Sequence, residues 1–446
     1  MSTTKVSPEL LEVAERCQKI AREKGASEVA ARAYKVRDVN VQWRDGRVEQ
    51  VNEATTRGVG LQLYVDGRFS SATSSDLRPE ALDTFIGDAV TMTRTLAKDP
   101  FRSLPDPKLY AGQSTVDLQI EDPAYETVTP ERRRQVAQAV EAASRSVKGA
   151  ESILSVTTGF SDNRAESVRV HSNGFTGARV DTAFWTSAQV SVKDPDGRRP
   201  EDYAYAGVRY VGEMPSAESI GRTAAERTLA RLGAKKPESA VLTMVLENRA
   251  AGRLVGALTA ALSGQALQQK RSFLEGKVGQ AVGSSRLTLT DEPLVPRAFG
   301  SRLFDGEGLA AKTLPIFDQG VLRNYYVDTY YGKKLQVAPT TAGASNLLVA
   351  LGDQDQSGLL KDLVDGILVT GFLGGNSNAT TGDFSFGVQG FRIRAGQIAE
   401  PVAELNISGN HLDFWKRLAA VGNDPWPYST YRTPTLVFEN VQFAGV

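Results

Sequence analysis

Cysteine and histidine are almost absent from this sequence of 446 residues, which has one cysteine, Cys17, and two histidines, His171 and His411. A single cysteine excludes an intramolecular disulfide framework and a zinc site built from several cysteines. The two histidines are far apart in the sequence, which excludes a zinc helix that carries both. His171 adjoins the expected Asn173-Gly174 turn and His411 begins a late helix, so we interpret both as surface or capping residues.

An excess of charge of either sign is absent as well, because 52 Lys and Arg residues balance 52 Asp and Glu residues. This balance argues against a protein dedicated to nucleic acid, which needs surplus positive charge. The 41% apolar and 23% charged residues are ordinary for a globular chain and exclude a disordered one. No run approaches the ~18 apolar residues of a membrane span, and we find no signal-peptide pattern at the start. We therefore expect a cytoplasmic protein that binds neither nucleic acid nor a membrane.

Self-contained catalytic motifs are the third absence, since the sequence has no H-E-x-x-H, no G-x-S-x-G and no P-loop. The stretch 306–311 matches a dinucleotide fingerprint, but Thr313-Leu314-Pro315 follows where that fingerprint requires a helix. We interpret it as a tight turn in which Asp305 and Glu307 are solvated or cap backbone amides. The arginine triplet 132–134 is similarly interpreted as a solvated helix face.

Hydrophobic periodicity predicts helices separated by β-hairpins. Hairpin turns are expected at Asp45-Gly46 and Asp66-Gly67, among others, and strands joined by tight turns are antiparallel. Cys17 lies on the apolar face of the first expected helix, which predicts a small core residue rather than a reactive thiol. The predicted helices cover 7–25, 79–96, 129–147, 217–232, 248–263, 357–365 and 410–421.

The fold class that this order predicts is α+β. We expect an N-terminal region of hairpins and helices, in one or two lobes, followed by a mainly antiparallel β domain. The expected division is an N-terminal α+β lobe at 1–97, a proline-containing linker at 98–128, a central α+β segment at 129–237 and a C-terminal, mainly β domain at 238–446.

Several blocks, taken in order, resemble the TldD/PmbA family over nearly the whole chain. They include RDGRVEQVNEATTRGVGLQLYVDGRFSSATSSDL (44–77), ALSGQALQQKRSFLEGKVGQ (261–280), LTDEP (289–293), SRLFDGEGLAAKTLPIFDQGVLRNYYVDTYYGKKL (301–335), TGDFSFGVQGFRIRAGQIAEPV (381–402) and ISGNHLDF (407–414). The resemblance implies a two-component protease, TldD with TldE (also called PmbA), that acts on unfolded or small peptide substrates. An older label of the family is modulator of DNA gyrase.

The family's TldD half carries an HExxxH helix and a downstream cysteine that hold the catalytic metal, and this chain departs from that pattern. The corresponding helix positions begin at Leu254 and Val255 and end at Thr259, and no cysteine follows Cys17. The resemblance is therefore closest to the TldE/PmbA half. It implies no catalytic residue, no metal ligand and no cofactor in this chain, and a metal, with zinc the expected ion, in a TldD-like partner.

The resulting hypothesis is a TldE/PmbA-like subunit of a TldD/TldE-type metalloprotease, which belongs to a peptidase family but is non-catalytic on its own. Its partners would be a TldD-like subunit, or a second copy of itself, and an extended peptide. A homodimeric peptide-binding module that works by strand addition stays open as an alternative, as does a non-metal hydrolase.

The glycine-rich segment 374–390 reads equally well as a peptide-binding edge or as a structural bulge at a sheet corner. Residues of this segment and of the 305–308 turn are the candidates for a substrate groove: Asn376, Thr381, Gly382, Asp383, Ser385, Asp305 and Glu307.

Overall fold

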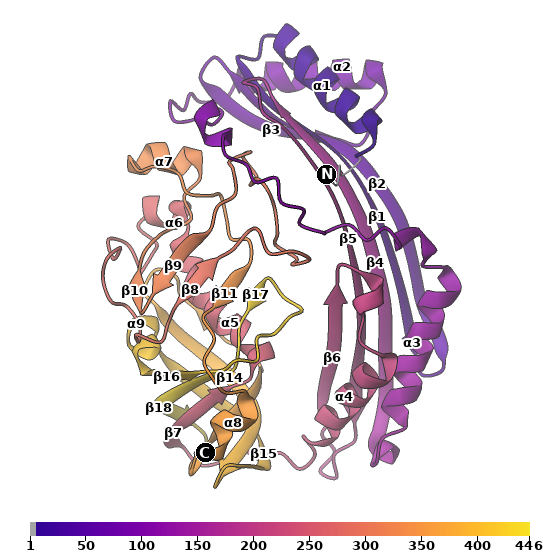
Figure 1. The fold of residues 1–446 in the computed structure, drawn as a ribbon, viewed down its shortest axis with the longest axis vertical. Helices are drawn as coiled ribbons and strands as arrows, with labels where there is room; N and C mark the ends of the chain where they lie inside the picture. Colours follow the sequence, from indigo (N-terminus) through magenta and orange to yellow (C-terminus); the bar gives the residue numbers. More distant parts are fainter. Residues whose placement is uncertain (1–5) are drawn as a thin grey trace.

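The computed structural model describes residues 6–446 and confirms an α+β fold (Figure 1). The N-terminal half contains a bowed six-stranded antiparallel sheet, in the order β3-β2-β1-β4-β5-β6. Its strands are β1 (Glu28–Arg44), β2 (Arg47–Val65), β3 (Arg68–Ser74), β4 (Ile153–His171), β5 (Thr176–Val192) and β6 (Glu201–Val208). The pairing of β1 with β4 joins the strands of residues 28–74 and those of residues 153–208 into one sheet.

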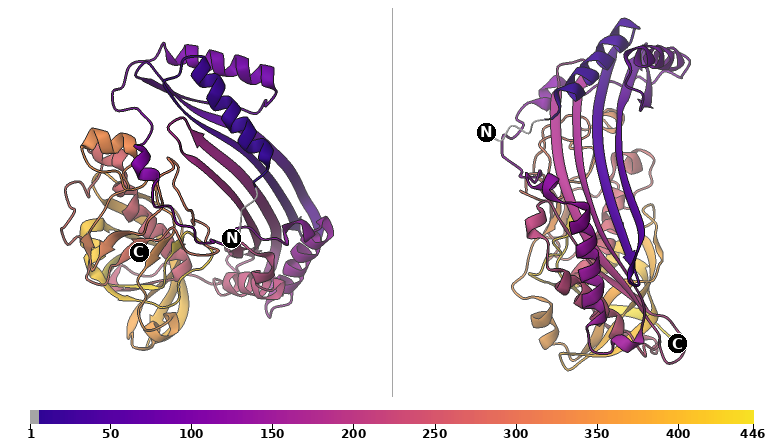
Figure 2. Two further views of the ribbon diagram at one scale, coloured as in Figure 1. Left: turned by 45° about the horizontal axis from the view of Figure 1, so that its top comes forward. Right: turned by 90° about the vertical axis from the view of Figure 1, so that its right-hand side faces the viewer.

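Four helices pack on one face of this sheet, here called the outer face, and leave part of it uncovered (Figure 2). They are α1 (Pro8–Glu23), α2 (Pro79–Thr93), α3 (Pro130–Arg145) and α4 (Ala217–Leu229). The apolar residues that alternate along β1, such as Val29 and Ala31, pack with the buried faces of α1 and α2. Cys17 is fully buried there, as predicted, and burial raises the pKa of its thiol to about 11. The helices therefore bury much of this face, but the middle of β2 stays uncovered, as the 56% exposed side chain of Val51 shows.

The interpretation of the arginine triplet as a solvated face is wrong for Arg133. This residue lies on the face of α3 that packs on β4, where its guanidinium is buried and forms a two-bond ion pair with Asp162. Arg132 is exposed, and Arg134 pairs with Glu131 at the surface. The helical period of 3.6 residues explains why the middle arginine alone points inward.

The C-terminal part is built on two further sheets and is mainly antiparallel. The seven-stranded sheet contains β7 (Ala240–Leu246), β12 (Asp365–Phe372), β13 (Asn376–Ser377), β14 (Asp383–Arg394), β15 (Gln397–Asn410), β16 (Leu418–Val421) and β18 (Leu436–Ala444). The five-stranded sheet contains β8 (Leu289–Asp291), β9 (Leu314–Asp318), β10 (Val321–Leu322), β11 (Leu347–Val349) and β17 (Tyr431–Arg432). Among the strand pairings of residues 6–446, β7–β12 and β11–β17 are parallel, and two isolated bridges, Lys235 with Val402 and Ser263 with Tyr326, are parallel as well.

Five helices accompany these sheets: α5 (Asn248–Thr259), α6 (Gly264–Gln268), α7 (Thr329–Leu335), α8 (Gln356–Lys361) and α9 (His411–Phe414). The expected helix over 410–421 is wrong after Arg417, because Leu418 and Val421 pair with β18 in β16. No helix in the described part of the chain is long and apolar enough to cross a membrane. The domain boundaries near 98, 128 and 238 stay predictions.

Aromatic side chains join the sheet to the C-terminal part. Trp185 of β5 stacks on Phe299 with ring centroids 4.7 Å apart. Gly207 on β6 makes room for this indole, since a Cβ atom there would lie 2.2 Å from the Trp185 ring. Trp426 donates its indole N–H to the Tyr205 hydroxyl at 2.9 Å. Through these contacts, the face of the six-stranded sheet that lies opposite the four helices packs against the C-terminal part.

Candidate functional site

The face of the six-stranded sheet opposite α1–α4, here called the inner face, is turned toward the C-terminal part. Arg179 donates to the Ser301 carbonyl at 2.7 Å, and Arg169 donates to the Gly306 carbonyl. Strand alternation and register place further residues on the same face. They are Arg32, Tyr34, Val36, Asp38 and Asn40 on β1, Asn52, Ala54, Thr56, Gly58 and Gly60 on β2, Ser161, Asn163, Ala165 and Ser167 on β4, and Asp181, Ala183 and Trp185 on β5.

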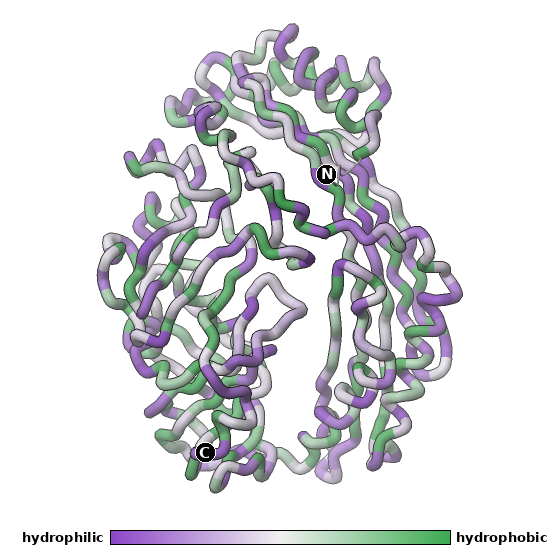
Figure 3. The backbone as a smooth tube through the Cα atoms, viewed as in Figure 1, coloured by the Kyte–Doolittle hydropathy of each residue, from purple (hydrophilic) through white to green (hydrophobic). Residues whose placement is uncertain are grey.

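These side chains are mostly polar or small, and hydropathy alternates along the long strands (Figure 3). An apolar inner face would gain free energy by packing against the C-terminal part and closing the space between them. A polar face gains little free energy from that contact. The Oδ1 atom of Asn163 is buried on this face without a hydrogen-bond partner in the described residues. A ligand N–H would satisfy such an acceptor, which is otherwise costly to bury.

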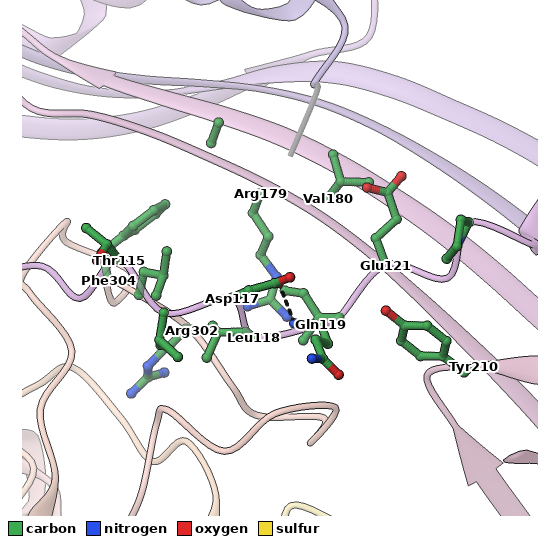
Figure 4. A pocket seen from close by; sticks show the side chains of 15 residues that line it. Thr115, Asp117, Leu118, Gln119, Glu121, Arg179, Val180, Tyr210, Arg302 and Phe304 are labelled. Atoms are coloured by element: carbon green, nitrogen blue, oxygen red, sulfur yellow. Dashed lines mark hydrogen bonds between the residues drawn. The ribbon is translucent and has the colours of Figure 1, made fainter. Parts of the chain in front are cut away.

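A cavity of about 600 Å³ lies between the inner face and the C-terminal part (Figure 4). Its walls are the extended segment 115–121 with Pro123, the start of β5, Tyr210 and residues 302–304. Apolar groups from Leu118, Leu303 and Phe304 alternate with charged groups from Glu121, Arg179 and Arg302. This size and mixture suit an organic ligand with apolar and polar parts, such as a peptide segment.

The segment 115–123 is held in place mainly through its backbone. The Leu118 carbonyl accepts from Arg297 N at 2.8 Å, and the Ile120 carbonyl accepts from Thr182 N at 2.9 Å. Asp122 N donates to the Thr182 hydroxyl at 2.8 Å. The cavity wall is thus an extended strand of the chain itself, bonded to the sheet on one side and the C-terminal part on the other.

A buried charge network borders this cavity. Asp181 accepts from Arg179 at 2.7 Å and from Arg209 at 2.6 Å. Burial alone would raise the pKa of Asp181, but the two guanidinium groups outweigh it and hold the pKa below its ordinary value. Arg209 also donates to the Phe299 carbonyl at 2.7 Å, so the network ties β5 to the C-terminal part.

Asp305 and Glu307 lie together in the turn that faces Arg169, and both bind backbone amides, as interpreted from the sequence. Asp305 accepts from the amides of Glu307, Leu309 and Ala342. Glu307 accepts from the amide of Thr329 at 2.8 Å, which lies in the first turn of α7. Burial raises the pKa of Glu307 despite these bonds. Both carboxylates are occupied in holding loops.

The other predicted groove residues lie together in a different place, at the β13–β14 connection. Asn376 pairs with Ser385, and Asp383 accepts from the Thr381 hydroxyl at 2.7 Å and the Asn410 amide at 2.9 Å. Gly382 has a φ of +85°, and its N–H donates to the Asn378 carbonyl. Much of this backbone is therefore paired within the chain, and its role in a groove stays a prediction.

The interpretation of the histidines as surface or capping residues is wrong, because both are buried and the ring nitrogens that have partners contact side chains rather than backbone at a helix end. His171 lies 3.0 Å from the Tyr110 hydroxyl through Nδ1, and its Nε2 has no partner in the described residues. His411 Nε2 lies 2.9 Å from Ser377 Oγ, and its Nδ1 accepts from the Trp415 indole at 3.2 Å. The aromatic ring of Phe273 stacks on His411 and helps to bury it.

Helix α5, at the positions expected for a metal helix, does not fit a metal. Leu254 and Leu258 are buried among apolar residues of the C-terminal core. Thr259 Oγ1 donates back to the Val255 carbonyl at 3.0 Å. Within residues 6–446 no three His, Cys, Asp or Glu side chains gather as a metal site. The donor set that zinc requires is thus missing from this helix.

The inner face was not found from the sequence. Its residues come from strands more than 100 positions apart, such as Asp38 on β1 and Asn163 on β4, which are direct partners. The available signal was the length of the strands: β1 and β5 have 17 residues, and each keeps polar residues at alternate positions. A strand of that length with one polar face indicates an open surface.

Comparisons with known proteins give one consistent result. Models of the PmbA/TldA metallopeptidase family match domain 1 at residues 29–93, the central domain at 123–232 and the C-terminal domain at 239–445. Metalloprotease PmbA of Escherichia coli O157:H7 is 29% identical over 415 residues, covering 92% of this chain and 91% of that protein. A homolog from Haemophilus influenzae is 27% identical over 431 residues, 96% of this chain and 94% of that protein.

Solved structures agree with these matches. A Bacteroides thetaiotaomicron protein named as a modulator of DNA gyrase superimposes with a TM-score of 0.95 at 39% identity, over 99% of this chain and 100% of that one. TldE from Thermococcus kodakarensis superimposes with a TM-score of 0.85 over 97% of this chain and 100% of that one. At 19% identity the TldE likeness concerns the fold alone.

Proposed function

Since the chain belongs to the PmbA/TldD metallopeptidase family, we propose that it is the TldE/PmbA-like subunit of a two-component metalloprotease. In this role it holds an extended or unfolded peptide between the inner face and the C-terminal part. A TldD-like partner supplies the catalytic metal. The chain itself contributes binding and no bond cleavage.

The observation that carries the proposal is the polar inner face with the 600 Å³ cavity beside it. An extended peptide presents unpaired N–H and C=O groups along its length, and these need polar partners. The inner face offers such partners, including the unpaired Oδ1 atom of Asn163. The apolar packing of Leu254 and Leu258 in α5 supports assigning the metal to the partner.

The binding half of the proposal is tested by the affinity of the purified chain for a fluorescent, unstructured peptide, measured by anisotropy. Asn163→Trp places a large side chain on the inner face, and we expect at least tenfold weaker binding. Val51→Trp is the matched control, because Val51 is 56% exposed and lies on the outer face opposite Val41. Equal binding by both variants would contradict the assignment of the inner face.

A further inference from the structure

Two arginines are direct cross-strand neighbours on the inner face. Arg32 on β1 pairs with Arg169 on β4, so both guanidinium groups point to the same side of the sheet. Like charges in directly opposite positions destabilise a sheet. A pair of this kind calls for a counter-charge close by.

The described residues supply that counter-charge only in part. Within residues 6–446 neither arginine forms an ion pair with a carboxylate; Arg32 lies 5.5 Å from the centre of the Tyr34 ring, and Arg169 donates to the Gly306 carbonyl. Asp305 and Glu307 attract Arg169 from the facing turn, but their oxygens accept from backbone amides and form no ion pair with it. Burial and then Arg32 lower the pKa of Arg169, and the attraction of Asp305 and Glu307 does not restore it.

A small pocket of about 160 Å³ opens beside these two arginines. Its floor is Gly60, the partner of Arg32 on β2, and Gln62, Ser71 and Thr73 lie on the same face around it. The side chains of Gln62, Ser71 and Thr73 make no hydrogen bonds to other described residues, so their donors are free for a ligand. A pocket of this size admits one charged group rather than a whole molecule.

We propose that Arg32 and Arg169 form an oxyanion subsite on the inner face, and that its ligand is a carboxylate of the bound peptide. The planar guanidinium fork matches a carboxylate in two-bond geometry, and Ser71 and Thr73 add hydroxyl donors. The carboxylate comes from the C-terminus of the peptide or from an Asp or Glu side chain. This subsite rests on the proposed function, because it anchors the same extended peptide.

The variants follow from the geometry. Arg32→Gln removes one guanidinium that has no hydrogen bond or ion pair within the described residues, so the fold loses only its approach to the Tyr34 ring. Gly60→Val fills the pocket without removing charge, since a Cβ at Gly60 meets only Thr73 Cγ2, at 3.9 Å. Lys35→Gln is the control, because it removes one charge from an exposed residue on the outer face of the same strand.

The experiment compares three labelled peptides of Gly, Ser and Ala by fluorescence anisotropy at low ionic strength. One has a free C-terminal carboxylate, one is C-terminally amidated, and one is amidated with a single internal Glu. We expect the wild-type chain to bind one or both carboxylate peptides about tenfold more tightly than the neutral peptide. Arg32→Gln and Gly60→Val are expected to abolish that preference, and Lys35→Gln to keep it.

The three peptides also separate the two proposals. If the neutral peptide binds and a carboxylate adds nothing, the subsite is wrong while the proposed function stands. If the preference persists in Arg32→Gln and Gly60→Val, the carboxylate is bound elsewhere and the subsite is likewise wrong. If none of the peptides binds, the proposed function fails together with the subsite. The peptide that shows the preference identifies the source of the carboxylate.

Discussion

Trp415 donates its indole N–H to Nδ1 of His411, and the opposite ring nitrogen, Nε2, lies 2.9 Å from Ser377 Oγ. A nitrogen that accepts a hydrogen bond carries no proton, so the proton of the neutral ring is on Nε2. His411 therefore donates to Ser377 and does not take its proton. A serine nucleophile needs the reverse arrangement, with the histidine as acceptor.

The first prediction is that Ser377 is not a nucleophile. Ser377→Ala is expected to leave peptide turnover by the chain and its partner within twofold of wild type. A fluorophosphonate probe is expected to leave Ser377 unlabelled, which mass spectrometry of the treated chain checks. Labelling of Ser377, together with loss of turnover in the alanine variant, would support the non-metal hydrolase instead.

The second prediction is that low pH destabilises the folded chain through the buried His411. Burial lowers the pKa of His411 to about 4, whereas an unfolded histidine titrates near ~6.5. Between these two pKa values, the histidine is protonated in the unfolded state and neutral in the folded state. Stability is therefore lost as the pH falls from about 6.5 toward about 4. At pH 5 this one residue is expected to remove about 2 kcal/mol of the stability present at pH 7.

Urea denaturation of wild type and His411→Gln at pH 7 and pH 5 measures this effect. Glutamine does not titrate, so the difference in unfolding free energy between the two proteins is expected to shrink by about 2 kcal/mol at pH 5. Carboxylates titrate in both proteins and cancel in the comparison. A difference that stays constant with pH would show that His411 is not buried as a neutral ring.

The third prediction is that α5 contributes to the stability of the fold by packing in the C-terminal core. Leu254 is fully buried in the C-terminal core, so Leu254→Ala is expected to lower the free energy of unfolding by about 2–5 kcal/mol. Leu254→Met keeps the volume and is expected to lose less than about 1.5 kcal/mol. Urea midpoints of the two variants provide the test, and an equal, small effect of both would contradict the core assignment.

The fourth prediction concerns the buried ion pair between α3 and β4. Asp162→Ala leaves the Arg133 guanidinium buried without its partner, and we expect a loss of about 3–5 kcal/mol. Glu131→Ala removes the exposed partner of Arg134 on the same helix and is expected to change stability by at most about 1 kcal/mol. Thermal or urea unfolding of both variants distinguishes the two environments.

Local patterns were sufficient to predict most elements. The expected helix over 129–147 is α3 (Pro130–Arg145), because Thr129 caps it and its apolar residues recur at helical spacing. The expected helix over 410–421 ends early because Leu418 and Val421 are needed by the sheet, and tertiary pairing overrides a short helical pattern. Helical period alone could not reveal which arginine of 132–134 finds an acidic partner on a distant strand.

The site was harder to predict because it is made by long-range pairing. Arg32 and Arg169 become neighbours only through the β1–β4 register, and Ser377 meets His411 across 34 positions. The sequence pointed to glycine-rich loops, where chemistry is often located. The structure places the polar inner face on regular strands, so the alternation of side chains, rather than the loops, defines it.

The most direct test of the subunit assignment is a peptide-cleavage rate measured for three samples. These are the purified chain, a TldD-like subunit with an HExxxH helix from the same genome, and their equimolar mixture. We predict that the chain alone cleaves nothing and that the mixture cleaves at least tenfold faster than the TldD-like subunit alone. Cleavage by the lone chain as fast as by the mixture, or no gain on mixing, would contradict the account.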